Sequence, residues 1–381
     1  MQLCVYSALV EVAAALVGGQ NEARLKAAFS AVEDWQELAS QAEIHGLSVM
    51  LGRLVANADI DAPRQLDLQL KALTVRHQKV LQARKIVLAE VIALFEKNQI
   101  QFAFLKGAAL AQLIYDPAWL RPMRDIDVLV SGKDAARAQT LLREIGFEND
   151  DFKAGYLFEH HHLPNSIRMQ GGFTISLEVH HDALSGDVDA SITLDNLSAP
   201  LLAFEYAGET AYAFGHTDTL KHLCYHSFEP AETIKLGSMV DMVRYAAFYA
   251  EDIDWPQLGK THPYIGNALR CVHALIPLPE ILHAPLAPLP GADWQVADLG
   301  HGFTPLSQIS KLSGFAKFKA LMLPSEWWMH IFHAVPPEKS LLFTRLVTHP
   351  ITIIKWLLRR YRAAHKSKSI ARDDHADASS I

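Results

Sequence analysis

The segment RDIDVLV places two carboxylates one residue apart, directly before an apolar run. Side chains alternate between the two faces of a strand, so Asp125 and Asp127 would share one face while Ile126, Val128 and Val130 point to the other. Two like charges this close repel each other, and a bound divalent cation removes that repulsion. The segment therefore predicts a strand with one buried face and a metal site on the other.

A third carboxylate follows in the segment FTISLEVHH, where Gly171-Gly172 signals a preceding hairpin turn. Alternation puts Glu178 and His180 on one face of this later strand and the apolar Leu177 and Val179 on the other. Three carboxylates from two adjacent strands can hold two Mg²⁺ ions, which prefer oxygen ligands and keep substrate phosphates in their remaining positions. We therefore take Asp125, Asp127 and Glu178 as the candidate metal ligands.

A strand-to-helix turn precedes both segments. The β-like run 102–105 meets Lys106, Gly107 and Ala108, and a series of helix-forming residues follows. A glycine here lets backbone N–H groups approach a phosphate at the start of a helix. Lys106 would bind that phosphate or stand as a surface lysine at the strand end. Together with the carboxylates, the turn predicts a site for phosphoryl or nucleotidyl transfer.

Two arginines lie between the turn and the paired aspartates. Arg121 and Arg124 could neutralise charge on a departing pyrophosphate. They could also pair with Asp116, with Asp134 or with the metal-binding carboxylates, and we expect one of the two to be structural.

The stretch FLKGAALAQLIYDPAWLRPMRDIDVLV closely resembles the bacterial family of uncharacterised nucleotidyltransferases, within the DNA polymerase beta-like nucleotidyltransferase superfamily. LEVHH is similar to the third motif of that family, and the segment LKHLCYH … MVDMVRYA is similar to its later helices. The resemblance covers roughly residues 30 to 250. It implies that Asp125 and Asp127 are shared by a catalytic and a nucleotide-bound Mg²⁺, and that Glu178 ligates the catalytic ion and helps to activate an acceptor hydroxyl.

For the phosphate side, the resemblance implies that Gly107, with Lys106 and Ala108 beside it, contacts the triphosphate of an NTP such as ATP. Arg121 and Arg124 would lie near the leaving pyrophosphate. The chain departs from the superfamily pattern in having Ala108 where many members have Ser or Gly.

Residue patterns and resemblance together predict an α/β (α+β) fold, with a small mixed-sheet core between large helical regions. We expect a helical N-terminal region over 1–98, the nucleotidyltransferase core over 99–215, a helical C-terminal region over 216–365 and a disordered polar tail over 366–381. Within the core, YLFEHHHLP is interpreted as a further strand.

The expected activity is Mg²⁺-dependent transfer of a nucleoside monophosphate from an NTP to an unidentified acceptor hydroxyl or phosphate, on a small molecule, a sugar phosphate or a peptide. Two alternatives keep this fold: a toxin-like or regulatory enzyme acting on protein or tRNA, and an inactive nucleotide-binding module. A fourth hypothesis is a histidine-based metallohydrolase, suggested by the run 160–162 and by the helical spacing of His222 and His226. Whether His180, His222, His226 and Asp241 line the site stays open at this stage.

Composition limits the partners and the compartment. The net charge of -7 makes nucleic acid an unexpected partner, and three scattered cysteines predict a reducing, cytoplasmic setting. Glu11 interrupts the apolar N-terminal stretch, which we interpret as a helix rather than a signal peptide, and we expect no transmembrane segment. The basic stretch 354–368 could lie on an anionic membrane, meet RNA, or be a solvated helix face.

Overall fold

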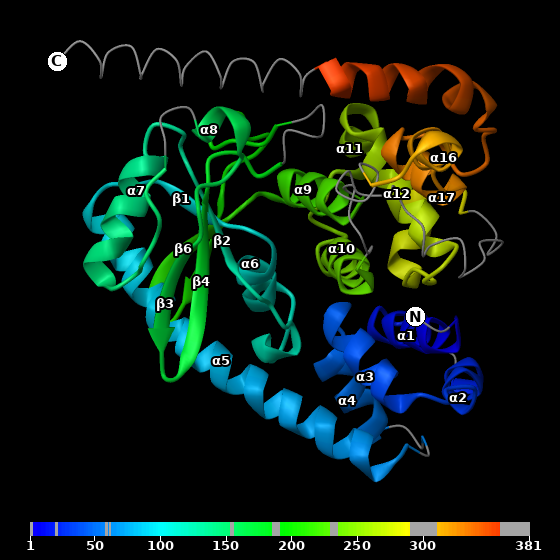
Figure 1. Cartoon of the computed structure of the whole chain (residues 1–381), viewed down its shortest axis with the longest axis horizontal. Helices are drawn as coiled ribbons and strands as arrows, with labels where there is room; N and C mark the ends of the chain where they lie inside the picture. Colours follow the sequence, from blue (N-terminus) through cyan, green and yellow to red (C-terminus); the bar gives the residue numbers. More distant parts are fainter. Residues whose placement is uncertain are drawn as a thin grey trace.

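A small mixed sheet forms the centre of the molecule in the computed structural model, which describes residues 3–19, 22–57, 60, 62–152, 156–184, 191–228, 235–289 and 311–358. Its strand order is β1-β2-β4-β3 (Figure 1), with bounds Phe102–Phe104, Ile126–Val130, Phe173–His180 and Ser166–Gln170 respectively. β2 and β4 run parallel, and the other two pairings are antiparallel. The predicted α/β class, with a small mixed sheet flanked by helical regions, is confirmed.

Strands β2 and β4 are neighbours, and Asp127 lies directly opposite Glu178 in their register. Ile126 pairs with Leu177 and Val128 with Val179, and all four of these apolar side chains are buried. The two strands therefore have the predicted alternation. One face of this strand pair is a continuous apolar surface, and the other carries the carboxylates.

The apolar face packs against the second half of α5, Arg64–Lys97, whose Val87, Val91 and Phe95 belong to the same core cluster as the strands. α5 runs from the N-terminal helices to the sheet (Figure 1). Ile86 of this helix is exposed, whereas Leu88 is part of its buried apolar stripe. The helices before α5 are α1, α2, α3 and α4, with bounds Leu3–Leu16, Glu22–Ser30, Trp35–Ile44 and Ser48–Asn57.

The prediction that YLFEHHHLP is a strand is wrong. Its first part is the short helix α8, Tyr156–Glu159, closed by a hydrogen bond from the His160 N–H to the Tyr156 carbonyl. His162 alone makes an isolated bridge, to His180 of β4. The other helical elements between β1 and β3 in the chain are α6, η1, α7 and η2, with bounds Lys106–Leu113, Ala118–Leu120, Ala135–Leu142 and Arg143–Ile145.

A hairpin that the sequence analysis did not predict covers the outer edge of β1. Its strands are β5, Leu202–Tyr206, and β6, Glu209–Ala213. The Tyr212 ring packs edge-on against Phe102 at 5.8 Å between centroids, and Tyr206 lies 6.3 Å from Phe104. These aromatic contacts fix the hairpin on the sheet.

The C-terminal region is helical, and its elements gather on one side of the sheet (Figure 1). They are α9, α10, α11, α12, η3, α13, α16 and α17, with bounds His216–Phe228, Leu236–Phe248, Trp255–Thr261, Pro263–His273, Glu280–Leu282, His283–Leu286, Gly314–Met322 and Glu326–Phe332. A last helix spans 342–358 and contains the π-helical turn η4, Thr344–Thr348. The predicted tail 366–381 and most of the basic stretch 354–368 lie outside the described residues, and the proposed domain boundaries stay predictions.

No helix in the part of the chain that the structure describes is both long and apolar enough to cross a membrane.

His45 joins the N-terminal helices to the start of α10. Its carbonyl accepts a hydrogen bond from the Gly237 N–H at 3.0 Å, and its Nδ1 accepts one from the Leu236 N–H at 3.2 Å. A Cβ on residue 237 would lie 2.5 Å from the His45 carbonyl oxygen, so this close approach requires glycine. Burial, together with the nearby Lys235 charge, lowers the pKa of His45 to about 4.

This shift predicts a pH dependence of stability. Because the folded chain binds the His45 proton less readily than the unfolded chain, His45 stabilises the fold fully above pH 6.5 and loses that contribution as the pH falls through about 4. His45→Gln should reduce the slope of unfolding free energy against pH in this window by up to about 1.4 kcal/mol per pH unit. Urea denaturation at several pH values measures it. His283→Gln, on the exposed His283, is the control, and an equal change in both variants would contradict the assignment.

The alternation in β4 predicts that substitutions on its two faces lower the unfolding free energy by different amounts. Leu177→Ala should lower the unfolding free energy by about 2–5 kcal/mol, because it leaves a cavity in the core between sheet and α5. Thr174→Ala, at an exposed position of the same strand, should change it little. Chemical denaturation of the two variants makes the comparison, and similar losses would show that the face assignment is wrong.

Candidate active site

Three side chains meet on the polar face of the central strands. His180 Nε2 lies 2.9 Å from Asp127 Oδ1 and 3.5 Å from Glu178 Oε2. One ligand atom from each of the three residues lies within 4.8 Å of the others, and we call this group the carboxylate–histidine cluster. Asp127 and His180 are buried, and Glu178 is partly exposed. The parallel register and the two-residue spacing along β4 bring the cluster together.

Lys106 approaches the cluster from the strand-to-helix turn. Its Nζ lies 3.4 Å from Asp127 Oδ2, and its side chain is largely buried, so it is not the surface lysine that was one alternative. The Leu105 N–H donates to the Asp127 carbonyl at 3.0 Å, which holds the turn against β2. The sequence thus correctly predicted that the turn neighbours the carboxylates.

These neighbours set the charge states of the cluster. Burial alone would raise the pKa of Asp127, but the Lys106 ammonium and the His180 hydrogen bond hold it well below its usual value. The same imidazole lowers the pKa of Glu178, against burial and the Asp127 charge. Burial would lower the pKa of His180, and its two carboxylate partners raise it instead. Both carboxyl groups are therefore ionised at neutral pH, as metal ligands must be.

Asp125 lies just outside this group. It directly precedes β2 and is exposed, and it is not a member of the cluster, which is the one set of three or more candidate ligands found among the described residues. Arg84 of α5 fixes the adjoining backbone, because its Nη2 donates to the carbonyls of Met123 at 2.8 Å and Arg124 at 3.0 Å. The Asp125 carboxylate is thus at the solvent side of the site, on a backbone held in place by Arg84.

Arg121 is part of a buried ion pair with Asp241 of α10. Its Nη2 lies 2.7 Å from Asp241 Oδ2, its Nε donates to both carboxylate oxygens, and the Tyr115 hydroxyl donates to Oδ1 at 2.7 Å. Burial would lower the pKa of Arg121, and the Asp241 carboxylate raises it above its ordinary value. The expectation that one arginine pairs with a carboxylate fits Arg121, although the partner is none of those considered from the sequence.

Gly107 lies beneath this arginine. A Cβ on residue 107 would be 3.0 Å from the Met123 Cβ and 3.2 Å from Arg121 Nη1. The glycine therefore lets the segment before β2 pack closely on the start of α6, and Ala108 is buried in the core behind it. The atoms that come close to Gly107 in this structure are those of the Met123 and Arg121 side chains.

The family assignment agrees with this geometry. A family described as uncharacterised nucleotidyltransferase matches residues 31–273, which is more than half of the chain. The chain belongs to this nucleotidyltransferase family. No curated protein matches it.

Solved structures give only distant likenesses. An antigenic nucleotidyltransferase-like protein from Paracoccidioides brasiliensis is 17% identical, with a TM-score of 0.33, and the match covers 50% of this chain and 93% of that one. The antibiotic-resistance factor ANT(2'')-Ia is 13% identical, with a TM-score of 0.29, over 48% of this chain and 98% of that one. The same factor in complex with adenylyl-2''-tobramycin matches at 13% identity, with a TM-score of 0.28, over 45% and 99%. We base no argument on these scores.

Two titratable side chains from the C-terminal region, Lys235 and His222, also lie near the candidate site. Burial lowers the pKa of Lys235, at the start of α10, and the neighbouring Arg124 guanidinium lowers it further, while the Asp125 carboxylate acts in the opposite direction. His222 of α9 is buried, and burial together with the Lys106 charge holds its pKa well below the usual value. Its partner at helical spacing, His226, lies 6.1 Å away between ring centroids. Lys235 was missed from the sequence, since nothing local relates it to the aspartates.

The histidine run does not build a second metal site in the described part of the chain. The rings of His161 and His162 lie 5.4 and 5.2 Å from that of His180, and His160 stacks on Tyr156. The one candidate ligand group there takes His180 alone from the histidines. The sequence left open whether His180 lines the site, and its contacts with both carboxylates place it in the cluster.

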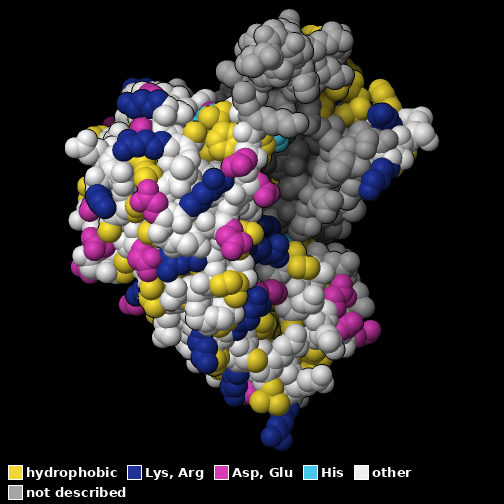
Figure 2. Space-filling view, turned by 60° about the vertical axis from the view of Figure 1, so that its left-hand side comes forward, with side chains coloured by type: hydrophobic (Ala, Val, Ile, Leu, Met, Phe, Trp, Pro, Cys, Tyr) yellow, Lys and Arg dark blue, Asp and Glu magenta, His cyan; other side chains and the backbone are white. Residues whose placement is uncertain are grey.

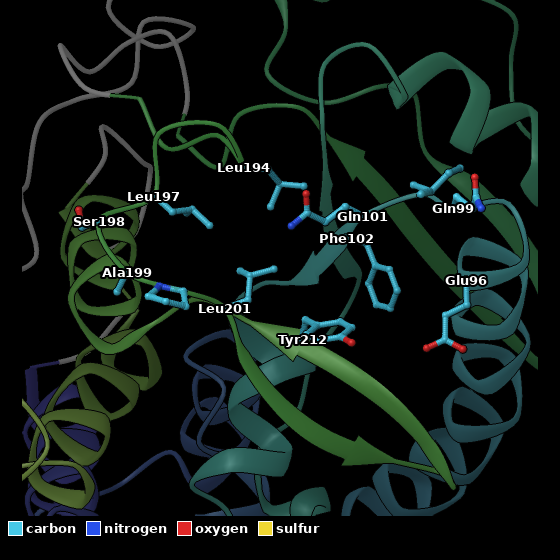
Figure 3. A pocket seen from close by; sticks show the side chains of 12 residues that line it. Glu96, Gln99, Gln101, Phe102, Leu194, Leu197, Ser198, Ala199, Leu201 and Tyr212 are labelled. Carbon is cyan, nitrogen blue, oxygen red and sulfur yellow. The ribbon is translucent and has the colours of Figure 1, made fainter.

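The pocket in Figure 3 lies at the other end of β1 from Lys106. Phe102 and Tyr212 form its floor, Leu201 and Leu197 lie on one side, and Glu96 of α5 on the other. Its lining includes no residue of the carboxylate–histidine cluster. It is therefore separate from the site argued above.

The Arg121–Asp241 pair predicts strong coupling between the two residues. Asp241→Leu should cost about 3–5 kcal/mol of unfolding free energy, because it leaves the buried Arg121 charge without its partner. The double variant Arg121→Met/Asp241→Leu should recover most of this loss. Urea denaturation of wild type, single and double variants measures the coupling.

Asp151→Asn serves as the matched control, since it removes the partner of Arg143 at the surface, where the Asp151 side chain is 92% exposed. This change should have little effect. A double variant no more stable than Asp241→Leu would contradict the coupling.

Proposed function

We propose that the chain transfers a nucleoside monophosphate from an NTP to an acceptor hydroxyl or phosphate and releases pyrophosphate. The observation that carries the proposal is Asp127 opposite Glu178 on adjacent parallel strands, beside the Lys106 turn. Membership of the nucleotidyltransferase family supports this class of reaction.

The cluster fits a divalent cation. It offers two ionised carboxylates and one imidazole nitrogen, and its closest ligand atoms are 2.9 and 3.5 Å apart, near the separation of neighbouring ligands around one small ion. Asp127, Glu178 and His180 would hold it, and Asp125 at the solvent side is the proposed further ligand toward a second, nucleotide-bound Mg²⁺. Bound metal would supply charge stabilisation at the transferring phosphoryl group and lower the pKa of the attacking oxygen.

The side chains of the protein supply the remaining parts. In the proposed step the acceptor oxygen bonds to the α-phosphorus, the bond from that phosphorus to the β-phosphate oxygen breaks, and pyrophosphate leaves with the electron pair. Glu178, partly exposed, would accept the acceptor proton. Lys106, Arg124 and Lys235 would offset the triphosphate charge. We assign Arg121 to positioning, because its guanidinium is held by Asp241.

The first test needs no acceptor. Melting temperatures are measured with ATP, GTP, CTP and UTP, with Mg²⁺, with Mn²⁺ and with neither, for wild type, Asp125→Asn/Asp127→Asn and Glu178→Gln. A nucleotide at one hundred times its Kd should stabilise the wild type by about 2.7 kcal/mol, only when metal is present. Both variants should lose this stabilisation, each compared with its own melting temperature without ligand.

Two further variants sharpen the test. Asp125→Asn alone leaves the buried Asp127 contacts intact, so its loss of nucleotide binding would not be a folding defect. Asp151→Asn, at an exposed position paired with Arg143, should behave as wild type. A metal-independent shift that survives in the double variant would instead support an inactive nucleotide-binding module and reject the proposed role of the aspartates.

A further inference from the structure

The last helix, 342–358, is apolar on both of its faces. Its inner face packs on the protein through His349, Ile353 and Trp356, which are buried. Its outer face carries Leu342 and Leu346, whose residues are 67% and 70% exposed, with further exposed side chains at Phe343, Val347, Ile351, Ile354, Leu357 and Leu358. A surface helix of a globular protein normally has a polar outer face, so this one has the composition of an interface.

Helix α16 extends the same apolar surface. Phe315 and Phe318 are 75% and 52% exposed, and their rings stack on one another at 6.3 Å between centroids. The two helices are tied together, because His349 Nε2 donates to the Leu321 carbonyl at 2.8 Å. Figure 2 shows apolar and basic side chains next to each other at the upper right, where the rotation from Figure 1 brings this part of the molecule. We call α16 and 342–358 together the C-terminal apolar surface.

The stretch of sequence that contains the last helix has a charge opposite to that of the whole chain. Residues 339–372 contain nine Lys and Arg and no Asp or Glu, although the chain has a net charge of -7. Within the described residues, Lys355 is exposed on the outer face of the last helix, and Lys317 and Lys319 are exposed on α16. Apolar side chains flanked by basic ones are the combination that binds the interface of an anionic bilayer.

From this we infer that the C-terminal apolar surface docks onto an anionic lipid membrane, with the helix 342–358 lying in the plane of the interface. A second copy of the chain is a poorer occupant, since a symmetric dimer would bring two sets of lysines together without acidic partners. RNA is also a poorer fit, because phosphates would not bury the exposed Leu and Phe side chains. The inference is independent of the proposed nucleotidyl transfer.

The test is flotation of the full chain with vesicles of phosphatidylcholine alone and of an equimolar mixture of phosphatidylcholine and phosphatidylglycerol. The wild type should bind the anionic vesicles and bind the neutral ones much more weakly. Leu342→Gln/Leu346→Gln should lower the partition coefficient by about tenfold or more, because two side chains would no longer enter the apolar layer. Lys355→Glu should also weaken binding, and added salt should weaken it further.

Leu68→Gln/Ile86→Gln is the matched control. It makes the same kind of change at exposed apolar positions of α5, 56% and 51% exposed, and should bind as wild type. Because every substituted side chain is exposed, melting temperatures should not move. Absence of binding to anionic vesicles, or equal binding by wild type and Leu342→Gln/Leu346→Gln, would overturn the inference. The inference would also be overturned if light scattering showed a wild-type dimer that is lost in Leu342→Gln/Leu346→Gln and no vesicle binding were seen. That result would identify a second copy of the chain as the occupant.

Discussion

The side-by-side placement of Asp127 and Glu178 is the constraint on which the rest of the site depends. Parallel pairing of β2 with β4 puts the two carboxylates opposite each other, with Asp127 buried. Burial and mutual repulsion both disfavour two ionised groups in this position. Lys106 and His180 supply the compensating contacts, one on each oxygen of Asp127. Two ionised carboxylates in this position require positive charge nearby. Lys106 and His180 supply some of it, and a divalent cation between the carboxylates would supply more.

The segment before β2 is held from two directions by two arginines, one of them buried and the other partly buried. Arg84 of α5 binds its backbone carbonyls, and Arg121, within it, pairs with Asp241 of α10. Buried ion pairs contribute modestly to net stability but penalise any arrangement that separates the partners. These contacts therefore define the position of Asp125 more than they add to the total stability. They also explain why helices distant in sequence, α5 and α10, are both needed to shape a site centred on two strands.

The helical regions serve different purposes in this molecule. α5 covers the apolar face of the sheet, while α9 and α10 bring His222 and Lys235 toward its polar face. The last helix differs from both, because its apolar side chains continue onto an exposed outer face. The core does not need this face, and the proposed membrane docking would explain its composition.

The sequence by itself determined the features that depend on neighbouring residues. Alternation along 126–130 and 173–180 separated the apolar side chains from the face that carries Asp127 and Glu178, and the turn at Lys106 marked the start of a helix. Local periodicity also misled: the aromatic run at Tyr156 was interpreted as a strand, but its backbone closes a helical turn.

Tertiary structure decided whatever depends on pairing between distant segments. The choice of His180 rather than Asp125 as the third member of the cluster follows from the β2–β4 register, and no local pattern specifies a register between strands so far apart. Arg121 pairs with Asp241 because the fold brings α10 beside the segment before β2, and the β5–β6 hairpin is fixed by aromatic contacts with β1. The residue types that a metal and nucleotide site requires could be recognised in the sequence. Their assembly into one site required the packing of the helices around the sheet.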